Sequence, residues 1–414
     1  MAFKSLFMQN PIALRALSLN QTVLPLFIVV MHFSPPATLI ASVLLLMVWL
    51  GAGYAKLTPT ILRNSGIALA ALALFLWLGL SAIYSAAPLA KSFSTLGKYR
   101  ELLLPLVLLP LLSSRQLRGR SETVLVITLF ATLLVSTAGY LHWLPAKLVN
   151  DVLKNRITHS LFMAFLGFYS LHQLYAQDKR KWLWGFVLLW VGANLFVMSN
   201  GRTGQVVFLG LGALFVFQHY KIRTALILSS VLLAAFVVFL WLSPYASRFW
   251  DGFHESVAFF THSGQLGKTS MGERLHFWTN AISIIEHAPW LGEGVGGFSY
   301  AFQEAFPQER ILANPHNEFL LITAQLGIPG LIAFLYFLGI TLKQSLQCHS
   351  IYSHLLQGVW LMLIVSCLFN SSILDHTEGH WFMTVIALFS ASMMDYRSLI
   401  GEAIGNDKTD EHVL

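Results

Sequence analysis

The stretch NPHNEFLLITAQLGIPG, at residues 314–330, joins a long polar interval to an apolar helix. The polar interval runs from Leu242 to Ile322, in a sequence that otherwise consists of apolar runs. A histidine at this junction lies where a large loop meets the edge of a membrane, and imidazole is the side chain that titrates near neutral pH. His316 is therefore the leading candidate for catalysis, and the adjacent Asn317 is expected to bind substrate.

The composition indicates a polytopic membrane protein. The chain has 414 residues, of which 56% are hydrophobic and 11% are charged, whereas a soluble domain carries about 25% charged residues. A span needs about 17 to 25 apolar residues, and this length predicts an all-α fold with about twelve transmembrane helices. Since no shift in composition marks a second folded domain, residues 1–414 are expected to form a single transmembrane domain.

One large loop is predicted at residues 244–315, between the ninth and tenth spans. Within it, SRFWDGFHESVAFF (residues 247–260) and the run from Glu273 to Glu286 have apolar residues at helical spacing, which predicts amphipathic helices. A glycine-rich turn follows at residues 292–297, but no strand precedes it, so the context excludes a dinucleotide-binding or P-loop motif.

The basic residues of the short connections predict the orientation of the chain, because cytoplasmic loops are enriched in Lys and Arg. If the N-terminus is cytoplasmic, every connection on that side carries a cation, as at residues 115–120 and 179–181. Both termini are then cytoplasmic and the large loop faces outward. In the inner membrane of a bacterium, a site in this loop faces the periplasm.

Cations on the outward side are unexpected under this rule and suggest a ligand with concentrated negative charge. Lys98 and Arg100 directly precede an apolar helix, where they could hold a phosphate or extend along the lipid surface to the headgroups. Arg156 and His159 fall at another outer helix start. His159 is a candidate for substrate binding, although a packed, hydrogen-bonded histidine is the commoner state.

Two further arginines have a stronger case for binding an anion. Arg202 lies in SNGRTG (residues 199–204), a turn too short to carry its charge freely into water, and an arginine beside the membrane needs a partner. Arg274 lies near the start of the helix predicted after Glu273. A cation is unfavourable at that end of a helix unless an anion lies between them.

The last outer connection, FNSSILDHTEGHWFMTV (residues 369–385), contains two carboxylates and two histidines. Their spacing matches no strong metal-binding motif. Asp375 and Glu378 are therefore expected to orient His316 or to bind a sugar hydroxyl, and no metal site is predicted.

Four motifs together carry a resemblance to a known family. They are SNGRTG (199–204), GERLHFW (272–278), PWLGEGVGGF (289–298) and PHNEFLLITAQLGIPG (315–330). With the large loop between the ninth and tenth spans, they resemble the O-antigen ligase and polymerase superfamily, and in length and layout the ligase branch.

The resemblance implies a glycosyltransferase of the membrane-embedded C superfamily (GT-C) that needs no metal and no cofactor. Its donor is a glycan on undecaprenyl pyrophosphate and its acceptor a sugar hydroxyl of lipid A-core, both within a lipid membrane and with no nucleic acid. The family's essential histidine corresponds to His316, its loop arginine to Arg274 and the arginine of its short turn to Arg202. His316 is then the base of a displacement that inverts the anomeric carbon, or alternatively a hydrogen-bond donor to the pyrophosphate.

Other functions share some of these features. An O-antigen polymerase and a protein O-oligosaccharyltransferase use the same donor and differ in the acceptor. A transporter of lipid-linked glycan or of small anions is the alternative from another class. Its charges would gather near the middle of the membrane, whereas the outward cations of this chain gather at one face.

Overall fold

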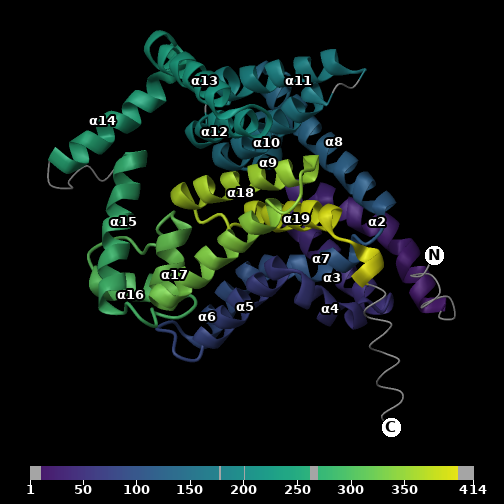
Figure 1. The fold of residues 1–414 in the computed structure, drawn as a ribbon. Coiled ribbons are helices and arrows are strands. Elements are labelled where there is room, and N and C mark those ends of the chain that lie inside the picture. The colour runs from purple at the N-terminus through teal and green to yellow at the C-terminus, as the bar shows by residue number, and fades with distance from the viewer. Residues whose placement is uncertain (1–10, 177–178, 200, 262–268, 400–414) are drawn as a thin grey trace.

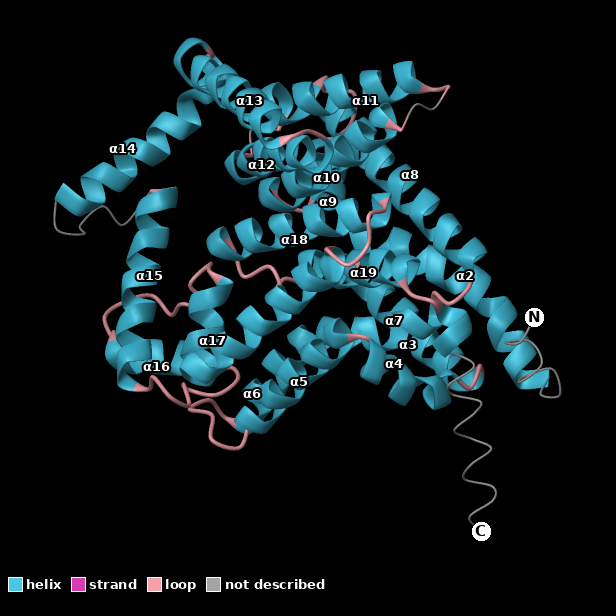
Figure 2. Ribbon diagram, in the orientation of Figure 1, coloured by secondary structure: helices cyan, strands magenta, loops and turns pink. Residues whose placement is uncertain are grey.

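The computed structural model describes residues 11–176, 179–199, 201–261 and 269–399. Every regular element within these ranges is a helix, which confirms the predicted all-α class (Figures 1 and 2). The first group comprises α2 (Pro11–Phe33), α3 (Pro35–Gly51), η1 (Tyr54–Leu57), α4 (Thr58–Asn64), α5 (Gly66–Ser81), α6 (Leu89–Leu96), η2 (Gly97–Leu103) and α7 (Leu104–Leu111).

The second group ends with the helix that leads into the large loop. It comprises α8 (Arg115–Tyr140), α9 (Ala146–Leu153), α10 (Arg156–Tyr175), α11 (Lys181–Ala193), the π-helical turn η3 (Asn194–Met198), α12 (Arg202–His219) and α13 (Ile222–Leu242).

The large loop and the last three helices form the third group. It comprises η4 (Pro244–Ala246), α14 (Ser247–Thr261), α15 (Ser270–His287), α16 (Phe298–Ala305), α17 (Glu318–Ser345), α18 (Ile351–Phe369) and α19 (His376–Met393). The two amphipathic helices predicted in the loop correspond to α14 and α15.

Helices α17, α18 and α19 run through the middle of the molecule, with α10–α13 on one side and α2–α7 on the other (Figure 1). Most residues of α10 and α19 are buried, and residues 158–170 and 377–391 are buried without a break, so these two helices are covered on every face along those stretches. A helix that is buried on every face belongs in the interior of a bundle. Helix α13 is the opposite case. Only 6% of its apolar stretch is buried, so its side chains are left to face lipid.

Six helical segments of the described residues are long and apolar enough to cross a membrane. Helix α3 and the η1–α4 segment, bent by 80°, would form a seventh. Four other helices are not among these segments: α5 is apolar but short, and α10, α12 and α19 carry polar residues. The expectation of twelve spans thus stays a prediction. The six are Pro11–Phe33, Arg115–Tyr140, Lys181–Met198, Ile222–Leu242, Glu318–Ser345 and Ile351–Phe369.

Helix α17 is interrupted where the glycine-rich turn of the large loop packs against it. Gly327 has φ 69° and ψ −174° within the helix. The carbonyl groups freed by this break accept hydrogen bonds from the turn, from Glu293 N to Ala324 O at 2.8 Å and from Gly294 N to Gln325 O at 2.9 Å. A Cβ at residue 327 would collide with the carbonyl oxygen of Trp290. The break therefore fixes the loop to the helix that His316 precedes.

Replacing Gly327 by alanine is expected to lower the free energy of unfolding by about 1–3 kcal/mol, because alanine is strained at positive φ and the turn must move away. Thermal unfolding of the purified protein in detergent measures this change. Gly339→Ala on the same helix is the matched control, since no atom lies within 4 Å of its added Cβ. Equal effects of the two substitutions would contradict the role given to the break.

Candidate functional site

Several helices begin at the same place in the molecule, and polar side chains cap three of these starts. Asn155 accepts a hydrogen bond from Thr158 N at 2.9 Å and begins α10. Asn317 caps α17 in the same way, and Asp375 caps α19. Backbone N–H groups and the positive ends of helix dipoles converge where helices begin, and together they favour anions.

A cavity of about 510 Å³ opens among these helix starts. Four arginines line it, together with two carboxylates and His316, so the lining carries an excess of positive charge. The charged residues and the histidine are Arg156, Arg202, Arg248, Arg274, Glu273, Asp375 and His316. The structure thus brings together five residues that the sequence placed on four separate segments: Arg156, Arg202, Arg274, His316 and Asp375.

Arg202 reaches from the start of α12 to the two helices of the large loop. Its Nη1 donates to Arg248 O at 3.0 Å, and its Nη2 donates to Ser270 Oγ at 3.3 Å. Gly252 on α14 permits this approach, because a Cβ there would collide with Arg202 Nη1. Arg202 therefore holds α14 and α15 over the cavity.

The arginines of the cavity destabilise one another's charge. Burial lowers the pKa of Arg274 below its ordinary value, and the charges of Arg202 and Arg248 lower it further. The pKa of Arg248 is also lowered, first by burial and then by Arg156 and Arg202. Among the described residues, Arg156, Arg202 and Arg274 form no ion pair with a carboxylate. An anionic ligand would relieve this repulsion, which makes the cavity suited to phosphate groups.

His316 lies at the edge of this cavity in a backbone conformation that residues other than glycine rarely adopt. Its φ is 53°, and its backbone N–H donates to Asn314 Oδ1 at 2.8 Å. Its ring Nδ1 lies 3.4 Å from Asn370 Oδ1. Burial is the largest cause that lowers the pKa of His316, and the charge of Arg274 adds to it, while Asn370 and Glu273 act in the opposite direction. The lowered pKa favours the neutral imidazole over the protonated form.

Asn370 orients His316 because a buried carboxylate orients Asn370. The Nδ2 group of Asn370 donates to Glu378 Oε2 at 3.0 Å, which turns its Oδ1 toward His316. Glu378 also accepts from Thr158 Oγ1 at 2.7 Å. Since Asn370 presents an acceptor, we assign the proton of the neutral imidazole to Nδ1, which leaves the lone pair on Nε2.

A second cavity, of about 430 Å³, adjoins the first. Lys98, Arg100 and His376 line it, and it shares His316, Asn370 and Asp375 with the first cavity. Arg100 Nη1 donates to Gly97 O at 2.6 Å, so its guanidinium is directed by the chain of η2. His316 therefore borders two cavities that both carry cations.

Three of the predicted site residues lie away from these two cavities. His159 is buried, with its Nε2 2.9 Å from Asn194 Oδ1, and it lines a separate cavity behind Arg156. The Nδ2 group of Asn317 donates to Leu368 O at 3.1 Å. Glu378 is 0% exposed and lies behind Asn370. A direct contact of these three with substrate stays a prediction.

Arg248 and Asn370 line the first cavity but are not among the site residues that the sequence predicts. Arg248 belongs to α14, whose approach to the cavity depends on tertiary contacts. Asn370 immediately follows the last residue of α18, and polar residues just outside an apolar span provide the only sequence signal for it.

Glu318 holds the other side of the site together. It is fully buried, and its Oε2 accepts from Ile373 N at 2.9 Å and Leu374 N at 3.3 Å. Tyr99 donates its hydroxyl to Glu318 Oε1 at 3.3 Å. These bonds join the start of α17 to η2 and to the connection before α19, so they fix His316 relative to Asp375.

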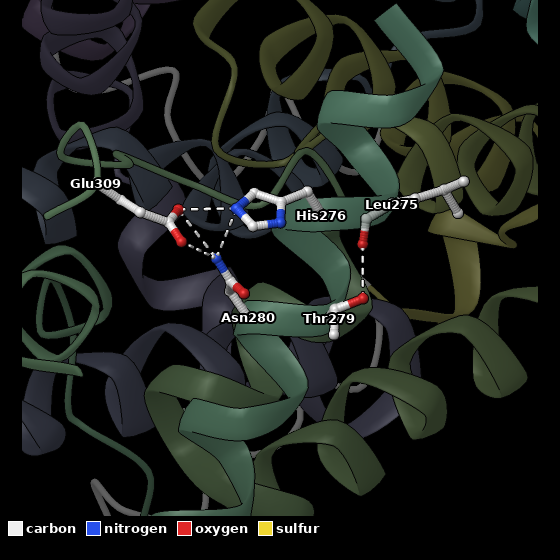
Figure 3. A network of polar contacts seen from close by, with 5 residues as sticks. All are labelled: Leu275, His276, Thr279, Asn280 and Glu309. Carbon is white, nitrogen blue, oxygen red and sulfur yellow. Dashed lines mark hydrogen bonds and ion pairs between the residues drawn. The ribbon is translucent and has the colours of Figure 1, made fainter. Parts of the chain in front are cut away.

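A polar network anchors α15 to the segment that leads to His316 (Figure 3). His276 Nε2 lies 2.9 Å from Glu309 Oε2. Asn280 Nδ2 donates to both oxygens of the same carboxylate, at 3.2 and 3.3 Å. The helix that carries Arg274 and the segment that carries His316 are thereby held in register.

Replacing Glu309 by glutamine is expected to loosen this anchor, because a charge-assisted contact to His276 becomes a neutral one. Amide hydrogen exchange across residues 306–317 should accelerate, by roughly threefold to tenfold for a partly exposed contact. Glu304→Gln is the matched control, because Glu304 is exposed and makes none of these bonds. Unchanged exchange in Glu309→Gln would show that the network does not restrain the segment.

Comparisons with known proteins agree with the motifs. A family model described as O-antigen ligase matches residues 186–335, a region that contains Arg202, Arg248, Arg274 and His316. The match confirms the resemblance that the motifs indicated. An uncharacterized protein of Haemophilus influenzae is 23% identical over 237 residues, which cover 51% of this chain and 57% of that protein. The chain thus matches little more than half of the length of the Haemophilus influenzae protein.

Proposed function

Because the family match supports membership of the O-antigen ligase and polymerase superfamily, we propose that this chain is a glycosyltransferase with the activity of an O-antigen ligase. It transfers a glycan from undecaprenyl pyrophosphate to a sugar hydroxyl of lipid A-core. The observation that carries the proposal is the cavity in which four arginines and His316 meet at converging helix starts.

The arginines bind the pyrophosphate of the donor. Arg156, Arg202, Arg248 and Arg274 surround one cavity, and a guanidinium can contact two phosphate oxygens at once. When the bond between the anomeric carbon and the pyrophosphate breaks, negative charge grows on the leaving oxygen. Fixed cations stabilise this charge strongly in a site with little water. The lipid part of the donor remains in the surrounding membrane.

His316 acts as the general base. Its Nε2 takes the proton of the acceptor hydroxyl while the hydroxyl oxygen attacks the anomeric carbon from the face opposite the leaving group. The electron pair of the broken bond goes to the pyrophosphate, and the configuration of the carbon inverts. No metal or cofactor takes part in this scheme.

Asn370 is a positioning residue for His316, since it holds the Nδ1 proton and aims Nε2 away from Glu378. The second cavity, with Lys98, Arg100 and Asp375, provides a place for the acceptor beside the same histidine. The arrangement separates donor and acceptor and leaves His316 between them.

The proposed reaction takes place at the periplasmic face of a bacterial inner membrane. The cations of the short connections support both cytoplasmic termini and an outward loop. A GT-C type of glycosyltransferase with twelve spans is part of the same proposal.

The acceptor separates this function from its alternatives. A polymerase or a protein O-oligosaccharyltransferase would use the same arginines and the same histidine. A transporter would need no base, and it would not benefit from orienting a neutral imidazole between two cavities. The Asn370–Glu378 contact therefore favours an enzyme over a carrier.

His316→Ala is expected to lower the rate of glycan transfer by about 10²–10⁴-fold, since a general base contributes this much. Binding of the lipid-linked donor should change little.

Arg274→Ala and Arg202→Ala should each weaken donor binding by about tenfold to a hundredfold, as expected for a lost hydrogen bond to a charged group. Transfer and binding are measured with purified protein and a defined lipid-linked glycan.

Arg310→Ala is the matched control for the arginine variants, because Arg310 is an exposed arginine of the same loop. Lipid A-core, a second donor molecule and a protein acceptor are supplied in parallel. Normal transfer by His316→Ala would exclude His316 as the base. Product on the second donor or on protein alone would replace the ligase with one of its alternatives.

The transfer rate should fall in acid as His316 becomes protonated. Because burial and Arg274 lower its folded pKa below 6.5, activity is retained at pH 7 and is lost as pH falls through that lowered pKa. Glu273 raises the pKa, so Glu273→Gln should move the acid limb of the pH–rate profile to lower pH. Glu304→Gln should leave the limb unchanged. A limb that moves to higher pH in Glu273→Gln would contradict the assignment.

A further inference from the structure

Three histidines meet at the ends of α10, α12 and α18 that lie away from Arg156 and Arg202. His172 Nδ1 lies 3.3 Å from His219 Nε2. The ring centroid of His354 lies 5.6 Å from that of His172 and 5.0 Å from that of His219. One ring nitrogen from each of the three histidines lies within 4.8 Å of the other two.

The spacing fits tetrahedral coordination. A zinc–nitrogen bond of about 2.0–2.1 Å places two tetrahedral nitrogen ligands about 3.3–3.4 Å apart. The His172–His219 pair is already at 3.3 Å. A ring nitrogen of His354 lies within 4.8 Å of both and would have to move closer to complete the set.

The burial of the cluster allows access from one direction. His172 is 3% exposed, whereas His219 and His354 are half-buried. The Nε2 of His172 makes no hydrogen bond of ordinary geometry to any described residue, although the side chain of Gln218 interacts with that ring. The Gln218 side-chain oxygen also lacks a hydrogen bond among the described residues. A buried polar nitrogen without a partner is costly, and a bound metal would reorganise the cluster and use these groups.

We propose that His172, His219 and His354 form a binding site for a divalent transition metal such as Zn²⁺. Neutral imidazole is the ligand that zinc, copper and nickel share. Water or the Gln218 oxygen completes the coordination. The site is independent of the proposed transfer reaction, and no step of that reaction uses it.

The position of the site assigns it a structural role. His172 is 16 residues after Arg156 on α10, which corresponds to about 24 Å along the helix. Arg202 begins α12, and Asn370 follows α18, so the helices joined by the metal are those that carry the candidate site at their other ends. A metal would tie the three helices together far from the chemistry.

Zinc binding to the full-length protein in detergent tests the proposal, after any histidine tag has been cleaved and metal removed with EDTA. Calorimetric titration with ZnCl₂ should show one tight site per chain, and Zn²⁺ should raise the Tm. Co²⁺ in its place should give the visible absorption of a tetrahedral complex. His172→Gln, His219→Gln and His354→Gln should each weaken zinc binding more than about tenfold and abolish the rise in Tm.

His287→Gln is the matched control, because His287 is an exposed histidine on α15 and should leave zinc binding unchanged. The Tm without metal and gel filtration show whether each glutamine variant is folded, and His354→Gln is informative even if the buried His172 cannot be replaced. Absence of a one-to-one site in the wild type would overturn the proposal. Equal zinc binding by wild type and His354→Gln would also overturn the proposal. His172 and His219 would then be a packed, hydrogen-bonded pair of histidines.

Discussion

The buried carboxylate of Glu378 is the group on which the geometry of the candidate site depends. It lies on α19 and is bonded to Thr158 on α10 and to Asn370 after α18, so one side chain connects three helices. A buried carboxylate without hydrogen-bond partners costs several kcal/mol. The three segments must therefore stay together for Glu378 to remain solvated by the protein. The orientation of His316 follows from this requirement, since Asn370 can offer only its oxygen to the ring.

Glu318 imposes a similar constraint from the other side, where it binds the backbone before α19 and the hydroxyl of Tyr99. The helix starts are thus fixed before any ligand binds. Four arginines in one cavity repel one another, and a rigid frame is needed to hold them at that distance. A site preorganised in this way stabilises charge that develops later without having to rearrange.

Much of the fold class and part of the site could be predicted from the sequence. Arg202, Arg274 and His316 each stand beside a helix start, a feature that local pattern reveals, and they do line one cavity. The sequence does not place Arg248 in the site, because its approach depends on how α14 packs. Local pattern gives the depth of a residue along its helix but not the direction of its side chain. The sequence therefore leaves open whether Glu378 orients His316 or binds a sugar hydroxyl, whereas the structure shows that Glu378 contacts Asn370, which contacts His316.

The number of spans was harder to predict for a related physical reason. An apolar run indicates burial, but burial in a bundle and burial in lipid produce similar runs, and α10 and α19 are enclosed by protein. The cluster of His172, His219 and His354 was beyond any local pattern, because its members lie on three helices. Only the packing of α10 against α12 and α18 brings them together.

The backbone of His316 fixes where its imidazole lies. Residues other than glycine adopt a φ near 53° at a cost of about 1–2 kcal/mol. The bond from its N–H to Asn314 and the cap of α17 by Asn317 offset this cost on either side of it. An extended backbone would not make the same turn between these two contacts. The strained turn therefore places the imidazole between the two cavities, where Nδ1 contacts Asn370. In the proposed reaction, Nε2 takes the proton of the acceptor hydroxyl.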